Sequence, residues 1–293
     1  MEKTLIFGHQ KPDTDSVTSS IVLSYLRNTL GDNTEPRVLG DINNETKFVL
    51  DYFKFDTPKY LNDVRLQIKD VDYAKDCFLN ANDSIYKAYK YMNETKIGTI
   101  PVIDNNDSYL GAVSMKDATQ SLIGDKVGKL NTSYDNLLEA LDAKEILRFD
   151  KEIKGNIIMA SYGSDSFKEN IAINEESVLI IGDRHKIIEY AVENSASIII
   201  LTNGVKMKEK HLEIAKKNHV DVISTKHDGI TTSNLVILSN YIKDNINKDE
   251  IISVNENDSL YDALEIANKK GYSNYPVIDN NGKCLGIFRA NIS

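Results

Sequence analysis

The sequence lacks tryptophan and contains only two cysteines, Cys77 and Cys284. Neither cysteine has another potential ligand nearby at the spacing of a zinc site, so neither a structural zinc ion nor a disulfide framework is indicated. Long apolar runs are also missing. The run at the N-terminus covers only residues 4–7, which is far too short for a signal peptide or a membrane-spanning helix. We therefore expect a cytoplasmic protein that has no membrane partner.

The sequence has fewer positively than negatively charged residues. The chain has 35 lysines and arginines against 44 aspartates and glutamates, which gives a net charge of −9. This balance argues against nucleic acid or an anionic membrane surface as a partner. It does not exclude a small anion, because a bound metal ion inverts the local field. With 293 residues, of which 41% are hydrophobic, the chain is long and apolar enough for two or three globular domains.

The N-terminal segment carries the strongest chemical signal. Residues 4–7 predict a buried strand, and the next residues, 8–16, read GHQKPDTDS. Apolar residues at helical spacing follow, at Val17, Ile21, Leu23 and Leu26. They predict a helix over 16–30 that packs on one side, with Asp15 or Ser16 as its N-cap.

This arrangement places His9, Asp13 and Asp15 in a strand-to-helix loop, where open α/β sheets bind ligands. An imidazole with two carboxylates suits manganese or cobalt better than calcium, and the helix N-terminus favours a phosphate anion nearby. The simpler alternative is that Asp13 and Asp15 only cap the helix and that His9 is an ordinary loop residue.

An internal repeat dominates the remainder. Residues 82–111 and 257–286 align without gaps. Each copy opens with Asn-Asp-Ser, which predicts an N-capped helix. A Pro-Val-Ile-Asp strand, an Asn-Asn turn and a strand ending at Leu-Gly follow. The repeat therefore predicts two β-α-β-β units.

The two copies differ after their last strand. The first reads GAVSMKD, with Ser114 and Asp117 in a G-x-x-S-x-x-D pattern, whereas the second has Arg289 in place of the serine. We expect asymmetric use of the two units. Arg289 can pair with a phosphate, and Tyr272 and Tyr275 can stack on a flat ring. The alternatives are a solvated arginine and tyrosines that fill the interior.

Between the copies, residues 126–246 alternate short apolar runs with amphipathic stretches. Strands are predicted at 156–160, 178–181, 198–201 and 220–223, and helices at 184–194 and 207–218. This alternation predicts a mostly parallel sheet with helices on its faces. The loops 182–185 and 224–232 lie at strand ends and are positioned to bind a ligand, although their residue types equally suit caps and turns.

The opening of the chain resembles a known enzyme family. Residues 1–16 and the segment EPRVLGDINNETKFVLDYFKFDTPKYL are similar to the start of a family II inorganic pyrophosphatase of the DHH phosphoesterase superfamily. The resemblance implies that His9, Asp13 and Asp15 bind Mn2+ or Co2+, with Mg2+ also possible. The family's V-D-H-N segment, Asp-His-His motif and later Asp are missing from the sequence. We therefore expect a fragment of a larger enzyme.

The repeat resembles a pair of CBS domains, which bind adenine nucleotides in a cleft between copies. This resemblance implies that Ser114 bonds a phosphate oxygen and that Asp117 accepts bonds from the ribose hydroxyls. It also implies nucleotide contacts by Tyr272, Tyr275 and Arg289. The other implied contacts are Lys96, Thr99, Ile100, Pro101, Lys116, Ser273, Asn274, Pro276 and Asn291. The region between the copies resembles the DRTGG domain found between CBS copies in some pyrophosphatases.

We therefore predict an α/β protein with four parts. Residues 1–62 form part of a DHH-type α/β domain, and residues 63–125 form the first CBS repeat. Residues 126–246 form an inserted parallel-sheet DRTGG-like domain, and residues 247–293 form a second, truncated CBS repeat.

The resemblances together imply a metal-dependent inorganic diphosphatase, hydrolysing pyrophosphate and regulated by AMP, ADP or ATP. A diadenosine polyphosphate is a further candidate regulator, and the CBS repeats would pair two chains into a homodimer. Two alternatives stay open. The chain acts only as an adenine-nucleotide sensor without catalysis, or its parent is another DHH phosphoesterase that cleaves polyphosphate or a cyclic dinucleotide.

Overall fold

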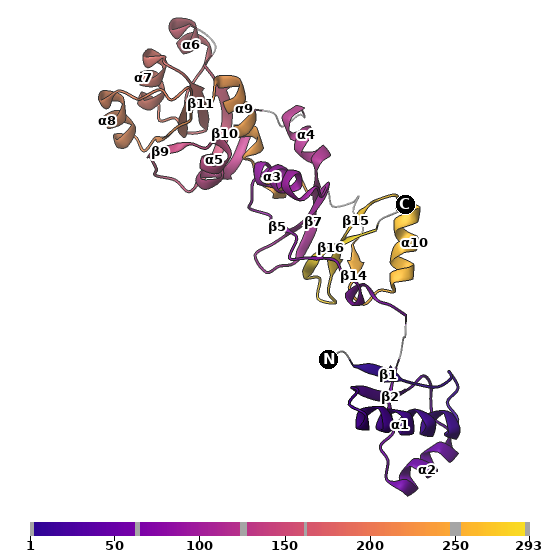
Figure 1. Ribbon diagram of the computed structural model, residues 1–293. Helices are drawn as coiled ribbons and strands as arrows, with labels where there is room; N and C mark the ends of the chain where they lie inside the picture. The colour runs from indigo at the N-terminus through magenta and orange to yellow at the C-terminus, as the bar shows by residue number, and fades with distance from the viewer. Residues whose placement is uncertain (1–2, 62–64, 124–127, 161–162, 247–252, 291–293) are drawn as a thin grey trace. The chain divides into compact units, whose positions relative to one another are not determined.

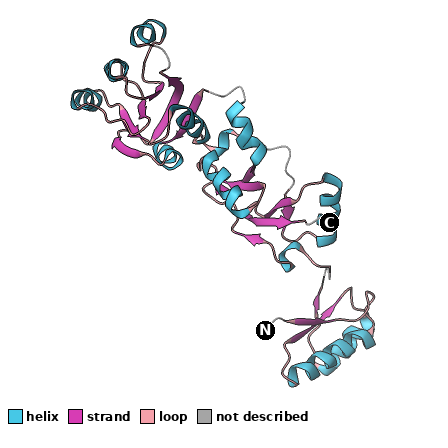
Figure 2. Ribbon diagram, turned by 45° about the horizontal axis from the view of Figure 1, so that its top comes forward, coloured by secondary structure: helices cyan, strands magenta, loops and turns pink. Residues whose placement is uncertain are grey.

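The computed structural model describes residues 3–61, 65–123, 128–160, 163–246 and 253–290 (Figure 1). The chain divides into two units, an N-terminal unit of residues 1–66 and a C-terminal unit of residues 67–293. Helices and strands alternate in both units (Figure 2), as the predicted α/β class requires. None of the described helices combines the length and apolar composition needed to cross a membrane.

The N-terminal unit is a small parallel sheet with two helices. Its strands lie in the order β1-β2-β3 and all run parallel. Its elements are β1 (Thr4–Ile6), α1 (Thr14–Thr29), β2 (Thr34–Val38), α2 (Asn44–Phe53) and β3 (Lys59–Tyr60). The predicted strand is therefore confirmed, and it leads into α1 through the loop 7–13.

Helix α1 corrects two details of the prediction. Its N-cap is Asp13, whose side chain accepts a hydrogen bond from the Ser16 backbone N–H, and not Asp15 or Ser16. The residues buried on it are Val17, Ser20 and Ser24. Leu23 and Leu26, which were expected on the packed face, are 46% and 51% exposed.

The physical reason is that helix α1 lies close to the sheet. The Ser24 hydroxyl lies 2.9 Å from the Thr34 hydroxyl of β2, so small side chains at Ser20 and Ser24 bring the helix axis near the sheet. The buried face thus follows the Val17, Ser20 and Ser24 positions, and the larger apolar side chains face away from the sheet.

In the C-terminal unit the two repeats form the predicted β-α-β-β units. The first consists of β5 (Leu79–Asn80), α3 (Ile85–Thr95), β6 (Thr99–Ile103) and β7 (Tyr109–Ser114), followed by α4 (Met115–Ile123). The second consists of β14 (Val254–Asn255), α10 (Leu260–Lys270), β15 (Asn274–Ile278) and β16 (Cys284–Arg289). Strand β4 (Ala74–Lys75) pairs with β16 at the edge of the second sheet.

The Asn-Asp-Ser signal behaves differently in the two copies. Ser84 caps α3, because its hydroxyl accepts a hydrogen bond from the Lys87 backbone N–H at 3.0 Å. Ser259 occupies the N-cap position of α10 but makes no side-chain cap bond. Its hydroxyl is buried without a hydrogen-bond partner in the described part of the chain. The cap prediction therefore holds fully only for the first copy.

The region between the repeats is a six-stranded sheet, in the order β8-β10-β11-β12-β13-β9. The four central strands are parallel, and the two edge strands are antiparallel to their neighbours. The strands are β8 (Lys129–Ser133), β9 (Lys144–Leu147), β10 (Glu152–Met159), β11 (Ser177–Ile181), β12 (Ile198–Leu201) and β13 (Asp221–Ser224). The helices are α5 (Tyr134–Leu141), α6 (Ser164–Asn170), α7 (His185–Glu193), α8 (Glu209–Lys217) and α9 (Gly229–Leu238).

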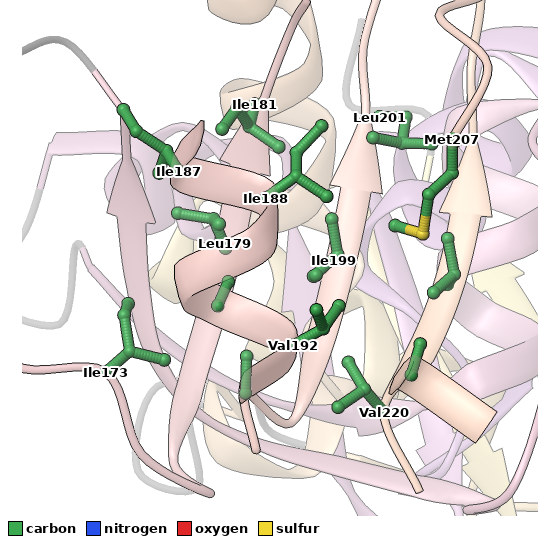
Figure 3. Packing of buried hydrophobic residues seen from close by; sticks show 14 of the residues in the cluster. Ile173, Leu179, Ile181, Ile187, Ile188, Val192, Ile199, Leu201, Met207 and Val220 are labelled. Carbon is green, nitrogen blue, oxygen red and sulfur yellow. The ribbon is translucent and has the colours of Figure 1, made fainter. Parts of the chain in front are cut away.

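Alternation along the central strands builds one core on each face of this sheet. Leu179 and Ile199 point toward α7 and pack with Ile188 and Val192 (Figure 3). Their neighbours in sequence, including Ile180 and Ile200, pack on the opposite face, in the same cluster as side chains of α5 and α9. The predicted sheet with helices on both faces is therefore confirmed. The carboxyl ends of β11, β12 and β13 consequently lie at one edge.

Candidate functional site

The N-terminal loop brings His9 and Asp13 together. The Nε2 atom of His9 lies 3.4 Å from Oδ1 of Asp13, and both side chains are 59% exposed. The same Oδ1 atom accepts a hydrogen bond from the Ser16 backbone N–H at 2.9 Å. Asp13 therefore caps α1, as the simpler alternative predicted, and still faces the imidazole.

Asp15 lies in the first turn of α1. Its Oδ1 atom accepts a hydrogen bond from the Ser19 hydroxyl at 3.3 Å. The loop itself is tightly packed, because a Cβ atom at Gly8 would lie 1.9 Å from the Ser16 hydroxyl oxygen. A side chain at residue 8 would therefore have to displace the Ser16 hydroxyl.

An imidazole nitrogen and a carboxylate are suitable ligands for a divalent transition ion. Among the described residues, however, no group of three or more His, Cys, Asp or Glu side chains is placed to hold a metal ion. The loop therefore brings together two groups of the kind that bind such an ion, His9 and Asp13.

In the first repeat, Ser114 and Asp117 form a reciprocal pair at the start of α4. Oδ2 of Asp117 accepts hydrogen bonds from the Ser114 backbone N–H at 2.7 Å and from the Ser114 hydroxyl at 2.6 Å. In return, the Asp117 backbone N–H donates to the Ser114 hydroxyl oxygen at 3.3 Å. This is a capping box with aspartate at its third position, and it leaves both side chains partly exposed.

Of the other predicted contacts in this repeat, strand pairing places Thr99 beside this pair. Thr99 faces Ser114 across the β6–β7 ladder, and the Met115 backbone N–H donates to the Gly98 carbonyl at 3.2 Å. Lys96 and Lys116 are exposed, whereas Ile100 and Pro101 are buried in β6. Sequence reasoning missed the Gly98 carbonyl, since nothing in its residue type marks a backbone contact.

The second repeat repeats this geometry with different chemistry. Asn274 faces Arg289 across the β15–β16 ladder, at the positions that correspond to Thr99 and Ser114. Arg289 is exposed, and so is Ser273. A guanidinium therefore stands where the first repeat has a hydroxyl. Asn291 lies outside the described residues.

The two tyrosines of the second repeat differ in their exposure to solvent. Tyr275 is 1% exposed and packs in a cluster with Val277 and Phe288, which favours the packing alternative, and burial raises the pKa of its hydroxyl. Tyr272 is 39% exposed. The two rings meet edge to face, with 6.5 Å between their centroids. Tyr272 therefore has the exposed ring, whereas Pro276 is buried beside Tyr275.

In the predicted loop 224–232, Asp228 acts as a helix cap. Oδ1 of Asp228 accepts a hydrogen bond from the Thr231 backbone N–H at 2.8 Å and so caps α9. Sequence reasoning missed a pairing nearby. His185 and His211 lie with ring centroids 5.8 Å apart, and burial lowers the pKa of the fully buried His211. These residues are far apart in sequence, and only the packing of α7 on α8 joins them.

Comparisons with known proteins agree with this architecture. A CBS domain model matches residues 68–124 and 242–291, and a DRTGG domain model matches residues 136–239. The cobalt-dependent inorganic pyrophosphatase of Clostridium perfringens is 33% identical over 288 residues, which are 96% of this chain and 52% of the relative. The probable manganese-dependent inorganic pyrophosphatase of Thermotoga maritima is 25% identical over 295 residues, which are 98% of this chain and 53% of the relative. The chain thus spans about half the length of these curated relatives.

A solved structure matches over its full length. It is the crystal structure of the CBS and DRTGG domains of the regulatory region of Clostridium perfringens pyrophosphatase, complexed with its activator, diadenosine tetraphosphate. It is 30% identical, has a TM-score of 0.67, and the match covers 77% of this chain and 100% of that chain.

Fold, strand-end geometry and these matches define a protein with CBS domains on either side of a DRTGG domain. The chain belongs to the family that includes the regulatory region of the Clostridium perfringens pyrophosphatase, and it is homologous to CBS-containing inorganic pyrophosphatases.

Proposed function

We propose that this chain contributes the regulatory region and the first metal ligands of a divalent-metal-dependent inorganic pyrophosphatase. The observation that carries the proposal is the Ser114–Asp117 pair, which stands beside Thr99 at the end of β7. This geometry supports an adenine nucleotide or a diadenosine polyphosphate as the ligand, because it presents a hydroxyl and a carboxylate at one strand end. The full-length match to a regulatory region complexed with diadenosine tetraphosphate supports the same conclusion.

In this proposal the two repeats contribute different contacts to the nucleotide. A carboxylate accepts two hydrogen bonds, so Asp117 suits the vicinal hydroxyls of a ribose. The Ser114 hydroxyl and the Arg289 guanidinium then meet phosphate oxygens from opposite repeats. Ile287 of β16 packs in the core cluster of the first repeat. We therefore expect a ligand that binds between the repeats to change how they pack against each other.

The N-terminal unit supports the catalytic part of the proposal. A bound manganese or cobalt ion would supply Lewis-acid activation of pyrophosphate and of the attacking water. His9 and Asp13 would hold that ion, and capping of α1 fixes the orientation of the Asp13 carboxylate. Asp15 would join them by turning away from Ser19.

The same unit exposes large apolar side chains on both of its helices. On α1, Val22 is 64% and Tyr25 is 76% exposed, and on α2, Phe48 is 69% and Tyr52 is 71% exposed. On α2 the Phe48 and Tyr52 rings lie with their centroids 6.2 Å apart, and exposed apolar surface of this kind marks an interaction site. Since the chain spans about half of its curated relatives, we infer that the other half of such a protein covers this surface and completes the metal centre.

One experiment tests the regulatory role. Calorimetric titration of the chain with AMP, ADP, ATP and diadenosine tetraphosphate should show saturable binding of at least one of them. Absence of binding by all four ligands would contradict the proposal. Sedimentation at several concentrations tests the homodimer that we propose to form through the CBS repeats.

A second experiment tests the catalytic role. With manganese or cobalt, the chain by itself should release phosphate from pyrophosphate only at the background rate, because in-line displacement uses a clamp of two metal ions. Rapid hydrolysis that is abolished by Asp13→Ala would show that the described loop suffices.

A second candidate function is an adenine-nucleotide sensor without catalysis. It is favoured by the lack of a three-ligand metal group among the described residues. Tight manganese binding that is lost in His9→Ala would argue against it.

A further inference from the structure

A cavity of about 570 Å3 lies in the DRTGG domain, at the carboxyl ends of β12 and β13. Three segments form its walls, namely residues 142–146, 204–207 and 224–226, and Leu212 of α8 adds to them. It shares no residue with the proposed nucleotide contacts of the CBS repeats. Its volume falls within the range of cavities that hold small organic ligands.

The walls are held together by hydrogen bonds between segments that are distant in sequence. The Gly204 backbone N–H donates to the Thr225 carbonyl at 2.8 Å. The Thr225 hydroxyl donates to the Leu141 carbonyl at 2.7 Å, and the Ser224 hydroxyl donates to the Val205 carbonyl at 3.3 Å. Ser224 also pairs with Lys144 across the β13–β9 ladder. The cavity is therefore preformed.

Its position is the one where α/β sheets bind ligands. Parallel strands direct the loops that follow them to one edge of the sheet, and ligands bind outside the carboxyl ends of the strands. Residues 204–207 follow β12, and residues 224–226 include the end of β13. The chain then continues into α9, which packs in the cluster on the opposite face from α7 and α8.

The lining combines an apolar surface with a cationic rim. Ile146, Val205, Met207 and Leu212 supply apolar side chains. Lys144, Lys206 and Lys226 are exposed around them, and none of the three forms an ion pair within the described residues. Of the two lining carboxylates, Glu145 already lies 3.7 Å from an Arg148 nitrogen.

We propose that this cavity is a second ligand site, and that it binds a small phosphate ester with an apolar or heteroaromatic body. Lysine ammonium groups bind phosphate as point charges, and the aliphatic side chains with Met207 accommodate a flat or irregular body. The chain as a whole has a net charge of −9, whereas three unpaired lysines make the rim of this cavity locally positive. The positive rim favours an anion over a cation.

The test uses pyridoxal 5′-phosphate, an aromatic phosphate ester whose aldehyde forms an imine with lysine. After borohydride reduction, peptide mapping of the full chain reports labelling at each lysine. Lys206 and Lys226 should be labelled at least about tenfold more than Lys216 and Lys217, because a cationic cleft concentrates anions. The two control lysines are also exposed, and they lie in the last turn of α8.

Competition identifies the ligand class. Excess ATP should protect Lys206 and Lys226, whereas octanoate, a carboxylate with an apolar chain, should protect them much less. Protection by octanoate but not by ATP would overturn the phosphate assignment. Labelling that is uniform over the exposed lysines would overturn the site itself.

A variant separates this site from the proposed CBS site. In Asp117→Ala, protection of Lys206 by ATP should persist, because Asp117 is not among the cavity residues. In Lys226→Gln, protection of Lys206 should weaken, since one of the three ammonium groups is lost. Loss of protection in Asp117→Ala together with full protection in Lys226→Gln would mean that ATP acts from the CBS repeats alone.

Discussion

Ser108 and Lys283 pair with each other in an antiparallel bridge, and they occupy corresponding positions of the two aligned repeats. The Tyr109 backbone N–H donates to the Gly282 carbonyl at 2.9 Å, and the Cys284 backbone N–H donates to the Asp107 carbonyl at 3.0 Å. These two bonds are also each other's counterparts. A local two-fold axis therefore relates the CBS repeats at this bridge.

Side chains break this symmetry. Lys283 forms an ion pair with Asp107 at 2.9 Å. The counterpart of that pair would join Ser108 to Gly282, neither of which carries a charge. The backbone thus presents two corresponding strand ends, whereas the side chains differ, as they do at Ser114 and Arg289. We therefore expect different ligand contacts in the two repeats.

The first prediction concerns Gly286, in β16. Its φ is +149°, and a Cβ atom there would lie 2.0 Å from the Ala74 carbonyl oxygen. Gly286→Ala should therefore lower the free energy of unfolding of the C-terminal unit by about 3 kcal/mol or more, since the backbone of β4 must move. Gly282→Ala is the control, because its φ is +80° but nothing lies within 4 Å of the added Cβ. We expect about 1 kcal/mol for this control. Equal losses in calorimetric unfolding would mean that β4 yields easily.

The second prediction concerns Asp117. Asp117→Ala should weaken adenine-nucleotide binding by about 1–3 kcal/mol, the cost of removing one partner of a buried or charged hydrogen bond. It should also destabilise α4, because the bonds from Ser114 are lost. The control is Asp228→Ala, which removes a helix cap from α9 but no proposed nucleotide contact. A normal dissociation constant in Asp117→Ala, measured by calorimetry, would show that this residue is only a cap.

The third prediction concerns Arg289. Arg289→Ala should reduce affinity for ADP more than for AMP, because ADP carries more negative charge. The loss should be larger at low salt, since an exposed ion pair is screened. Lys217→Ala in α8 is the control for general charge. Titrations with both nucleotides at two ionic strengths decide the matter. An equal, salt-independent loss for AMP and ADP would indicate a packing role for Arg289.

The fourth prediction is a pH dependence that arises at Asp221. This side chain is fully buried; its Oδ1 atom accepts a hydrogen bond from the Phe149 backbone N–H at 2.6 Å, and its Oδ2 atom has no partner among the described residues. Burial raises the pKa of Asp221 from 3.8 to about 6. The folded state therefore binds more protons than the unfolded state between these pH values. The contribution of Asp221 to the free energy of unfolding is therefore largest below pH 3.8, and it decreases as the pH rises through about 6.

Asp221→Asn should remove this dependence. At neutral pH the variant should be more stable than the parent by up to about 3 kcal/mol, since each pKa unit corresponds to about 1.4 kcal/mol. Urea unfolding at pH 4 and pH 7 measures the difference. Asp228→Asn is the control, because the backbone hydrogen bond from Thr231 lowers the pKa of Asp228 below 3.8, so its effect should change little between pH 4 and pH 7. A difference between parent and Asp221→Asn that does not change with pH would contradict the assignment.

Local patterns in the sequence determined the elements of this protein. The repeated segments are Asn-Asp-Ser, Pro-Val-Ile-Asp and Asn-Asn, which specify a helix start, a strand and a turn. Each of these signals involves only a few neighbouring residues. They therefore predicted both β-α-β-β units correctly. The apolar runs at 178–181 and 198–201 likewise predicted buried parallel strands, because strands covered on both faces are apolar throughout.

Only the tertiary structure decided which side chains meet. The spacing of Leu23 and Leu26 is compatible with a buried helix face, yet the contact of Ser24 with Thr34 leaves both leucines exposed. The approach of His185 to His211 depends on the packing of α7 on α8, which residue types do not encode. The cavity beside Lys206 and Lys226 depends on three segments that are distant in sequence. Contacts of this kind arise from the packing of whole elements, whose relative placement a local pattern does not contain.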